Sequence, residues 1–151
     1  MIKTLILDLD GVLTDGKQYI ASDGSKLFKA FHSRDIRAIR ELTATGMEVL
    51  VLSADDWPGG VIWCNNSGAR FEYSRNKSEW LTGTSINPRD AAVIGDDAWD
   101  IPLLNWTQYA FAPSDASPCV FSECLHVKRL DVAGGQGVVS EFVRVFIGAL
   151  I

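Results

Sequence analysis

The sequence predicts an α/β fold in which a mostly parallel sheet is covered by helices on both faces. Apolar runs typical of buried strands alternate with segments of helical periodicity. Three of these runs, such as LILDLD and VLVLS, end in acidic or hydroxyl side chains. Because ligands of such sheets bind beyond the carboxyl ends of the strands, the same pattern also predicts where a functional site lies.

The first third of the chain predicts a strand, a hairpin and a helix. Residues 3–9 (KTLILDL) are apolar enough to form a buried strand. Residues 18–31 contain two strand-like halves on either side of the turn sequence Ser-Asp-Gly-Ser, which indicates a β-hairpin. Residues 35–45 have apolar side chains at helical spacing, and Gly46 follows as a stop signal.

The remaining segments continue the alternation. We expect strands over 48–53, 69–74, 90–97, 107–113 and 124–129. Helices are expected over 58–67, 77–83, 98–105 and 137–151. The length suits one domain spanning residues 1–151, because single domains commonly contain 100 to 150 residues.

Composition limits the choice of partners and compartment. A net charge of −5 disfavours nucleic acid and anionic membrane surfaces, although a bound metal would let the protein take an anionic substrate. No apolar stretch is long enough to span a membrane. The three cysteines form no CxxC pair and are odd in number, which predicts reduced thiols in a cytoplasmic protein.

Asp8 and Asp10 end the first predicted strand, and residues two apart in a strand share one face. Two adjacent carboxylates repel each other unless a cation or a proton lies between them. Mg²⁺ suits such oxygen ligands, and Asp96 would supply another oxygen from a neighbouring strand end. The alternative is that these acids only form turns and cap helices.

A carboxylate beside Mg²⁺ can act as a nucleophile toward phosphorus, while a second carboxylate acts as general acid and base. The charged phosphoryl oxygens then need positive or hydrogen-bonding partners. Lys77 and Ser53 are candidates for this role. The sequence therefore favours metal-assisted phosphoryl transfer.

These segments resemble the four motifs of the haloacid dehalogenase superfamily of aspartate-nucleophile phosphatases. DLDGVLTDG, at 8–16, resembles the first motif, Ser53 the second, Lys77 the third, and GDDAWD, at 95–100, the fourth. The resemblance implies a Rossmann-like sheet and Mg²⁺. The short interval between Asp10 and FHSRD leaves room for a small β-hairpin flap and for no cap domain.

Three further segments are similar to the capless phosphatases that act on ulosonic acid phosphates of eight or nine carbons. They are KLFKAFHSRD at 26–35, GDDAWDIPLL from residue 95, and AGGQGVVSEF at 133–142. The resemblance implies a small phosphorylated sugar acid as substrate. It also implies a homotetramer in which the hairpins pack together and a neighbouring subunit closes each site.

The resemblance also implies a role for each candidate residue. Asp8 would be the nucleophile and Asp10 the acid/base. Mg²⁺ would be held by the side chains of Asp8 and Asp96 and by the backbone carbonyl of Asp10. The remaining candidates are the phosphate-binding pair Ser53 and Lys77, the substrate-binding pair Ala54 and Asp55, and the acids next to the metal, Asp97 and Asp100.

The chain departs from the family pattern where substrate is recognised. Ser53-Ala54 replaces the usual Thr-Gly, Ile36 replaces a glycine, and Gln136 replaces a basic residue. Asp55 stands where eight-carbon enzymes tend to have Arg and nine-carbon enzymes Glu, so it favours a nine-carbon substrate slightly. The glycines around Gln136 could act at a neighbour's site or only form a loop.

Three other functions remain open from the sequence. The substrate could be a smaller sugar phosphate. The fold could be retained as a scaffold without turnover, because the recognition positions are altered. A receiver-like signalling module phosphorylated near Asp55 or Asp56 also has paired acids at the first strand end, but it has no reason to carry a second acidic cluster such as GDDAWD.

Overall fold

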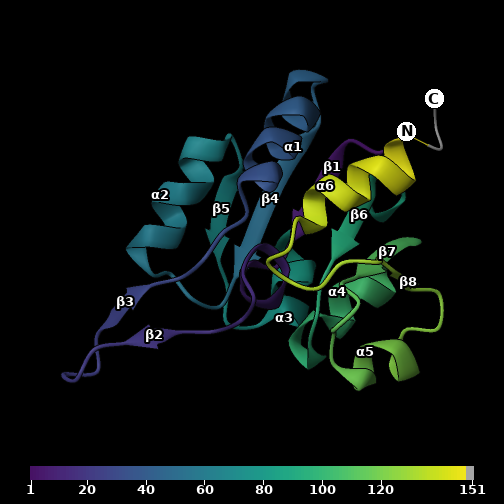
Figure 1. Cartoon of the computed structure of the whole chain (residues 1–151). Helices are drawn as coiled ribbons and strands as arrows, with labels where there is room; N and C mark the ends of the chain where they lie inside the picture. The colour runs from purple at the N-terminus through teal and green to yellow at the C-terminus, as the bar shows by residue number, and fades with distance from the viewer. Residues whose placement is uncertain (149–151) are drawn as a thin grey trace.

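The computed structural model describes residues 1–148 and is built on a six-stranded parallel sheet (Figure 1). The strand order is β5-β4-β1-β6-β7-β8. The strands are β1 (Thr4–Leu7), β4 (Glu48–Ser53), β5 (Arg70–Tyr73), β6 (Ala91–Ile94), β7 (Tyr109–Ala112) and β8 (Lys128–Arg129). Since β1 pairs in parallel with both β4 and β6, the carboxyl ends of these three strands are neighbours.

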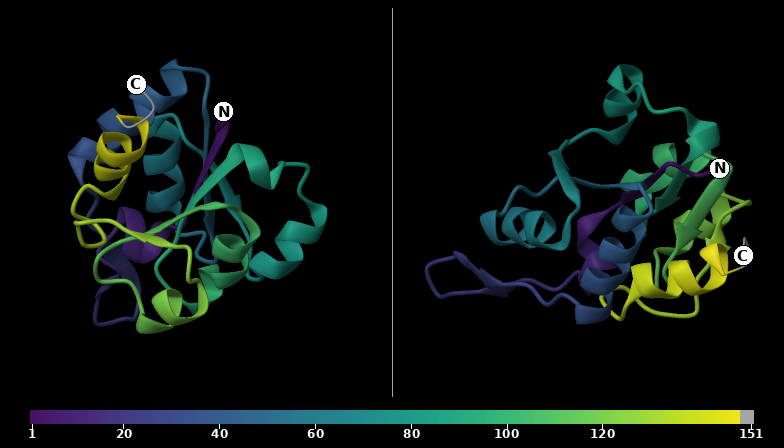
Figure 2. Two further views of the ribbon diagram at one scale, coloured as in Figure 1. Left: turned by 90° about the vertical axis from the view of Figure 1, so that its right-hand side faces the viewer. Right: turned by 90° about the horizontal axis from the view of Figure 1, so that it is seen from above.

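Helices cover both faces of this sheet (Figures 1 and 2). One face packs against α1 (Ser33–Ala44), α2 (Pro58–Ser67) and α6 (Val138–Phe142). The other packs against α3 (Lys77–Gly83), α4 (Ile101–Trp106) and α5 (Pro118–Glu123). Side chains alternate along β1 and so contribute to the hydrophobic cores on both faces of the sheet. Leu5 and Leu7 lie in the core with α1, α2 and α6, and Ile6 lies in the core with α3, α4 and α5. The predicted Rossmann-like α/β fold is confirmed.

Between β1 and α1 the chain forms the predicted hairpin, β2 (Tyr19–Ile20) and β3 (Lys26–Phe28), which projects from the sheet (Figures 1 and 2). The Tyr19 and Phe28 rings stack across the two strands with their centroids 4.3 Å apart. The described residues contain no cap domain over the strand ends, as the sequence predicts.

Several boundaries differ from the predictions. The first strand ends at Leu7 and is followed by a tight turn over Leu9–Leu13, so the expected strand 3–9 is too long. The helix α5 was not predicted. The terminal helix begins at Val138 and continues as a wider turn over Val143–Ile147; the last three residues of the predicted helix, 149–151, lie outside the described residues.

The helices of the described chain are too short or too polar to cross a membrane.

Candidate active site

A cavity of about 330 Å³ lies at the carboxyl ends of β1, β4 and β6. Its lining contains all but one of the predicted site residues: Asp8, Asp10, Ser53, Ala54, Asp55, Lys77, Asp96 and Asp97. The exception, Asp100, lies directly behind this surface and contacts Lys77. The structure therefore brings together side chains that are up to 92 residues apart in the sequence.

Asp8, Asp96 and Asp100 form an acidic cluster in which one oxygen of each lies within 4.8 Å of the others. Burial, together with the neighbouring carboxylates, raises the pKa of Asp8 and of Asp96. Asp96 Oδ1 is buried and has no hydrogen-bond partner within residues 1–148. Such a site fits a hard divalent cation such as Mg²⁺, which would bind the free oxygen and offset the repulsion.

Lys77 is the only cation in direct contact with this cluster among the described residues. It begins α3, and its Nζ donates to Asp8 Oδ1 at 2.9 Å and to Asp100 Oδ1. Only 6% of the residue is exposed. Burial alone would lower the pKa of Lys77, but the carboxylates of Asp8 and Asp100 raise it above its ordinary value. The buried amine therefore stays charged.

Asp97 and Asp100, the two acids that follow Asp96 in this motif, differ in burial. Asp97 is exposed and accepts from the Ala98 N–H at 2.7 Å, whereas Asp100 is buried and accepts from the backbone N–H groups of Asp96 and Asp97. The two carboxylates form a reciprocal cap on the first turn. Asp100 therefore lies inside the site, while Asp97 lies at its surface.

Asp10 lines the same cavity as Asp8 but lies on the turn that follows β1. Its carboxylate accepts from Lys29 Nζ at 3.0 and 2.8 Å and from Thr14 Oγ1 at 3.0 Å. The next residue, Gly11, has a φ of +85°, and a Cβ there would lie 1.8 Å from Asp96 Oδ2. Glycine is therefore required for Asp96 to approach this turn.

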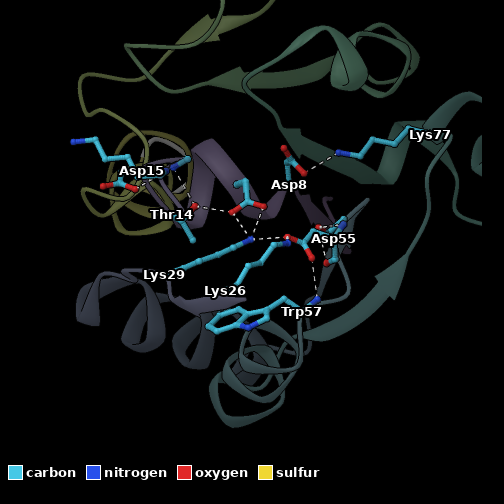
Figure 3. A network of polar contacts seen from close by, with 12 residues as sticks. Asp8, Thr14, Asp15, Lys26, Lys29, Asp55, Trp57 and Lys77 are labelled. Atoms are coloured by element: carbon cyan, nitrogen blue, oxygen red, sulfur yellow. Dashed lines mark hydrogen bonds and ion pairs between the residues drawn. The ribbon is translucent and has the colours of Figure 1, made fainter. Parts of the chain in front are cut away.

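Ser53 and Asp55 shape the loop that follows β4. Ser53 Oγ is almost fully buried and accepts from the Asp55 N–H at 3.0 Å. The Asp55 carboxylate accepts from Lys26, from Lys29 at 2.8 Å, and from the Trp57 N–H at 3.0 Å (Figure 3). Burial tends to raise the pKa of Asp55, but the lysine hydrogen bonds lower it to about 2. Asp55 is therefore ionised and already partnered.

Sequence reasoning missed three basic residues at this site. Lys26 and Lys29, from the hairpin, reach acids on two other loops (Figure 3). Arg75 is exposed, lines the cavity, and donates from Nε to Tyr73 Oη at 2.6 Å. Nothing in the local pattern of KLFKAF or YSRNK marks these side chains, because the pairing depends on how distant loops meet.

The glycine-rich segment before α6 packs against the turn that follows β1. A Cβ on Gly134 would lie 2.1 Å from the Gly11 carbonyl oxygen, and Gly135 N donates to Val12 O at 3.0 Å. Gln136 is exposed, while Ile36 is half-buried on α1 and does not line the cavity. Within this chain the segment thus supports the turn that follows β1.

Known phosphatases are similar to this chain in sequence. No protein-family model matches the chain. The 3-deoxy-D-manno-octulosonate 8-phosphate phosphatase KdsC of Escherichia coli K12 is 34% identical over 146 residues, which cover 93% of this chain and 76% of that protein. KdsC of Yersinia pestis is 31% identical over the same coverage.

Solved structures extend the likeness to the fold. The cobalt-bound deoxy-D-mannose-octulosonate 8-phosphate phosphatase (YrbI) of Haemophilus influenzae has a TM-score of 0.86 and 31% identity, covering 98% of this chain and 88% of that one. The Moraxella catarrhalis phosphatase, solved with magnesium, phosphate and KDO, has a TM-score of 0.83 and 20% identity, covering 99% and 94%. The chain belongs to the KdsC-type phosphatase family of the haloacid dehalogenase superfamily.

Proposed function

We propose that this phosphatase hydrolyses 3-deoxy-D-manno-octulosonate 8-phosphate, or a closely related ulosonic acid phosphate, with Mg²⁺ and through an aspartyl-phosphate intermediate. The observation that carries the proposal is the meeting of Asp8, Lys77 and the partnerless Asp96 oxygen in one cavity. The names of the relatives at 31 to 34% identity support the substrate class.

Asp8 is the proposed nucleophile. Its carboxylate forms a bond to phosphorus while the bond from phosphorus to the sugar oxygen breaks. Lys77 holds Asp8 Oδ1 and offers a donor to the phosphoryl oxygens. The Ser53 hydroxyl, which donates to the Asp55 carbonyl oxygen at 3.1 Å, would turn to the phosphate as a second donor. Asp10 gives its proton to the leaving sugar oxygen, and later takes a proton from the water that attacks the phosphoaspartate.

The proposed metal ligands are the side chains of Asp8 and Asp96 and the backbone carbonyl of Asp10. When bound, Mg²⁺ would offset the negative charge of the transferring phosphoryl group. Asp100 lies within the same acidic cluster and also pairs with Lys77, and Asp97 lies at the cavity surface. These two acids would orient the ligands and the lysine.

The residues that line the cavity affect which size of sugar acid it accepts. Ala54 and Asp55 line it and would contact the sugar. The sequence favours nine carbons on the basis of Asp55 alone. Because the Asp55 carboxylate is partnered by Lys26 and Lys29, it has little capacity left for a sugar hydroxyl. We therefore propose the eight-carbon substrate first.

We also propose that the protein forms a homotetramer and works in the cytoplasm. The hairpin exposes four large apolar side chains, Tyr19, Ile20, Leu27 and Phe28, which supports the homotetramer that the family resemblance implies. Cys64, Cys119 and Cys124 are free thiols, which supports a reducing, cytoplasmic environment.

The test is phosphate release with Mg²⁺ from octulosonate 8-phosphate, a nine-carbon ulosonate 9-phosphate and an aryl phosphate. We expect preference for the first. We also expect Asp8→Asn to reduce kcat by at least about 10³-fold, because the nucleophile is lost, while the fold is unchanged. An Asp8→Asn protein of wild-type activity would contradict the mechanism.

Other outcomes assign the site differently. Turnover of aryl phosphate alone would keep the chemistry and point to another small sugar phosphate. No turnover of any substrate would favour a scaffold without catalysis. A phosphoryl label on Asp55 instead of Asp8 would favour the receiver-like function, although Asp55 is already paired with two lysines.

A further inference from the structure

Lys29 is a fully buried lysine that bridges two carboxylates of the active site. Its side chain is 0% exposed, and its Nζ donates to both oxygens of Asp10 and to Asp55 Oδ2 (Figure 3). The ring of Trp57 lies beneath it, 5.8 Å from Nζ. Because a buried ammonium group is costly without partners, these contacts hold Lys29 in one place.

The same contacts fix the carboxylate of Asp10. Both of its oxygens accept from Lys29, and Oδ1 also accepts from Thr14. About 30% of the Asp10 side chain nevertheless faces the cavity. A general acid must lie within hydrogen-bond reach of the oxygen that it protonates, so a carboxylate free to rotate would serve poorly.

We propose that Lys29 is a positioning residue that orients Asp10 for proton exchange with the leaving oxygen, and that Asp55 anchors Lys29. The inference rests on the proposed roles of Asp8 and Asp10. Asp10 releases one proton as the bond between phosphorus and the sugar oxygen breaks, and regains one from the attacking water. Lys29 keeps its own protons throughout.

The bridge also makes the hairpin part of the catalytic site. Lys29 directly follows β3, Asp10 follows β1, and Asp55 follows β4, so one amine joins three loops. Among the described residues, Lys26, three residues earlier, pairs only with Asp55, and its side chain remains 31% exposed. Lys26 is therefore a matched control, since it also pairs with Asp55 but does not contact Asp10.

The experiment compares kcat/KM on two leaving groups, because this constant reports phosphoryl transfer to the enzyme. An alkyl phosphate, octulosonate 8-phosphate or whichever sugar phosphate the wild type hydrolyses, needs a proton on its leaving oxygen. p-Nitrophenyl phosphate does not need one. We expect Lys29→Met to lose about 10²-fold on the alkyl phosphate and less than about threefold on the aryl phosphate. Asp10→Asn should show the same selectivity.

Lys26→Met should lose little on either substrate, with no selectivity between them. Thermal melting will establish that the variants are folded. If Lys29→Met does not fold, Lys29→Gln, which keeps a neutral donor, should give a smaller selective loss. A merely structural role would not distinguish the two leaving groups.

Two results would overturn the inference while the wild type remains active. One is an equal loss on both substrates in the folded Lys29 variant. The other is the same selective loss in Lys26→Met. A wild type that hydrolyses no phosphate ester would instead overturn the proposed function, and this inference with it.

Discussion

Arg75 is the cation of the cavity that has no acidic partner among the described residues. Lys77, by contrast, is held by two carboxylates. A guanidinium group pairs with a carboxylate through two parallel hydrogen bonds, and the substrate proposed here is a sugar acid. We therefore expect Arg75 to bind the substrate carboxylate.

Arg75→Ala should lower kcat/KM for the sugar acid phosphate about tenfold or more, since a hydrogen bond to a charged group is lost. The aryl phosphate, which has no carboxylate, should be affected much less. Arg89→Ala is the matched control, because Arg89 is exposed and lies at the opposite end of the sheet, before β6. Steady-state kinetics measure both substrates, and an equal loss on the two would contradict this role.

At the scale of single residues, the motif residues could be predicted from the sequence, but the side chains that contact them could not. The strand ends and the family motifs identify Asp8, Lys77 and Asp96 from the amino-acid sequence alone. That Lys29 binds Asp10 depends on the path of the hairpin, which local patterns do not encode. Asp97 and Asp100 illustrate the same limit, because nothing in the sequence GDDAWD indicates that the first is exposed and the second buried.

Among the helices, Asp35 joins α1 to α6. It is fully buried in the first turn of α1, and its Oδ1 accepts from the backbone N–H groups of Val139 and Ser140. Its Oδ2 is buried and accepts no hydrogen bond from the part of the chain that the structure describes. Burial raises the pKa of Asp35 to about 6, although the backbone hydrogen bonds act to lower it.

This shift predicts a pH dependence of stability. Between pH 4 and 6 the unfolded chain loses the Asp35 proton while the folded chain keeps it, so the free energy of unfolding falls as pH rises. The loss is about 3 kcal/mol for a shift of this size. Asp35→Asn cannot titrate but still accepts from the α6 amides, so its stability relative to wild type should increase over this range.

Denaturant unfolding of both proteins at pH 4 and pH 7 measures the effect. Comparison with the wild type cancels the titration of all other groups. A difference in unfolding free energy that is the same at both pH values would contradict the raised pKa of Asp35.

Most elements could be predicted from the sequence, and β4, α2 and α3 have the predicted bounds. The six-residue α5 is too short to show helical periodicity. The end of β1 was missed for another reason. Asp8 N still bonds to Ile94 O at 3.1 Å, but the positive φ of Gly11 turns the chain, and no apolar pattern reports such a turn.

At the scale of the whole molecule, the hairpin is poorly covered by the rest of the described chain. Tyr19, Ile20, Leu27 and Phe28 are each at least 40% exposed. A two-stranded hairpin is marginally stable in water on its own, and apolar side chains gathered on it favour burial against another surface. We expect further copies of the chain to supply that surface.

Phe28→Glu should therefore shift the assembly toward the monomer, because a charge would be buried at the contact. Light scattering measures the mass of both proteins, and Arg37→Glu on the exposed face of α1 serves as a control. A wild type that is monomeric at all concentrations would contradict the expected assembly.

The contact of Gly134 and Gly135 with the turn after β1 has a consequence for biosynthesis. The ribosome makes the turn after β1 more than 100 residues before the glycines that support it. The central strand β1 likewise can pair with its two neighbours only after β4 and β6 have been made. In a nascent chain this turn therefore lacks its support until the glycine-rich segment has been made.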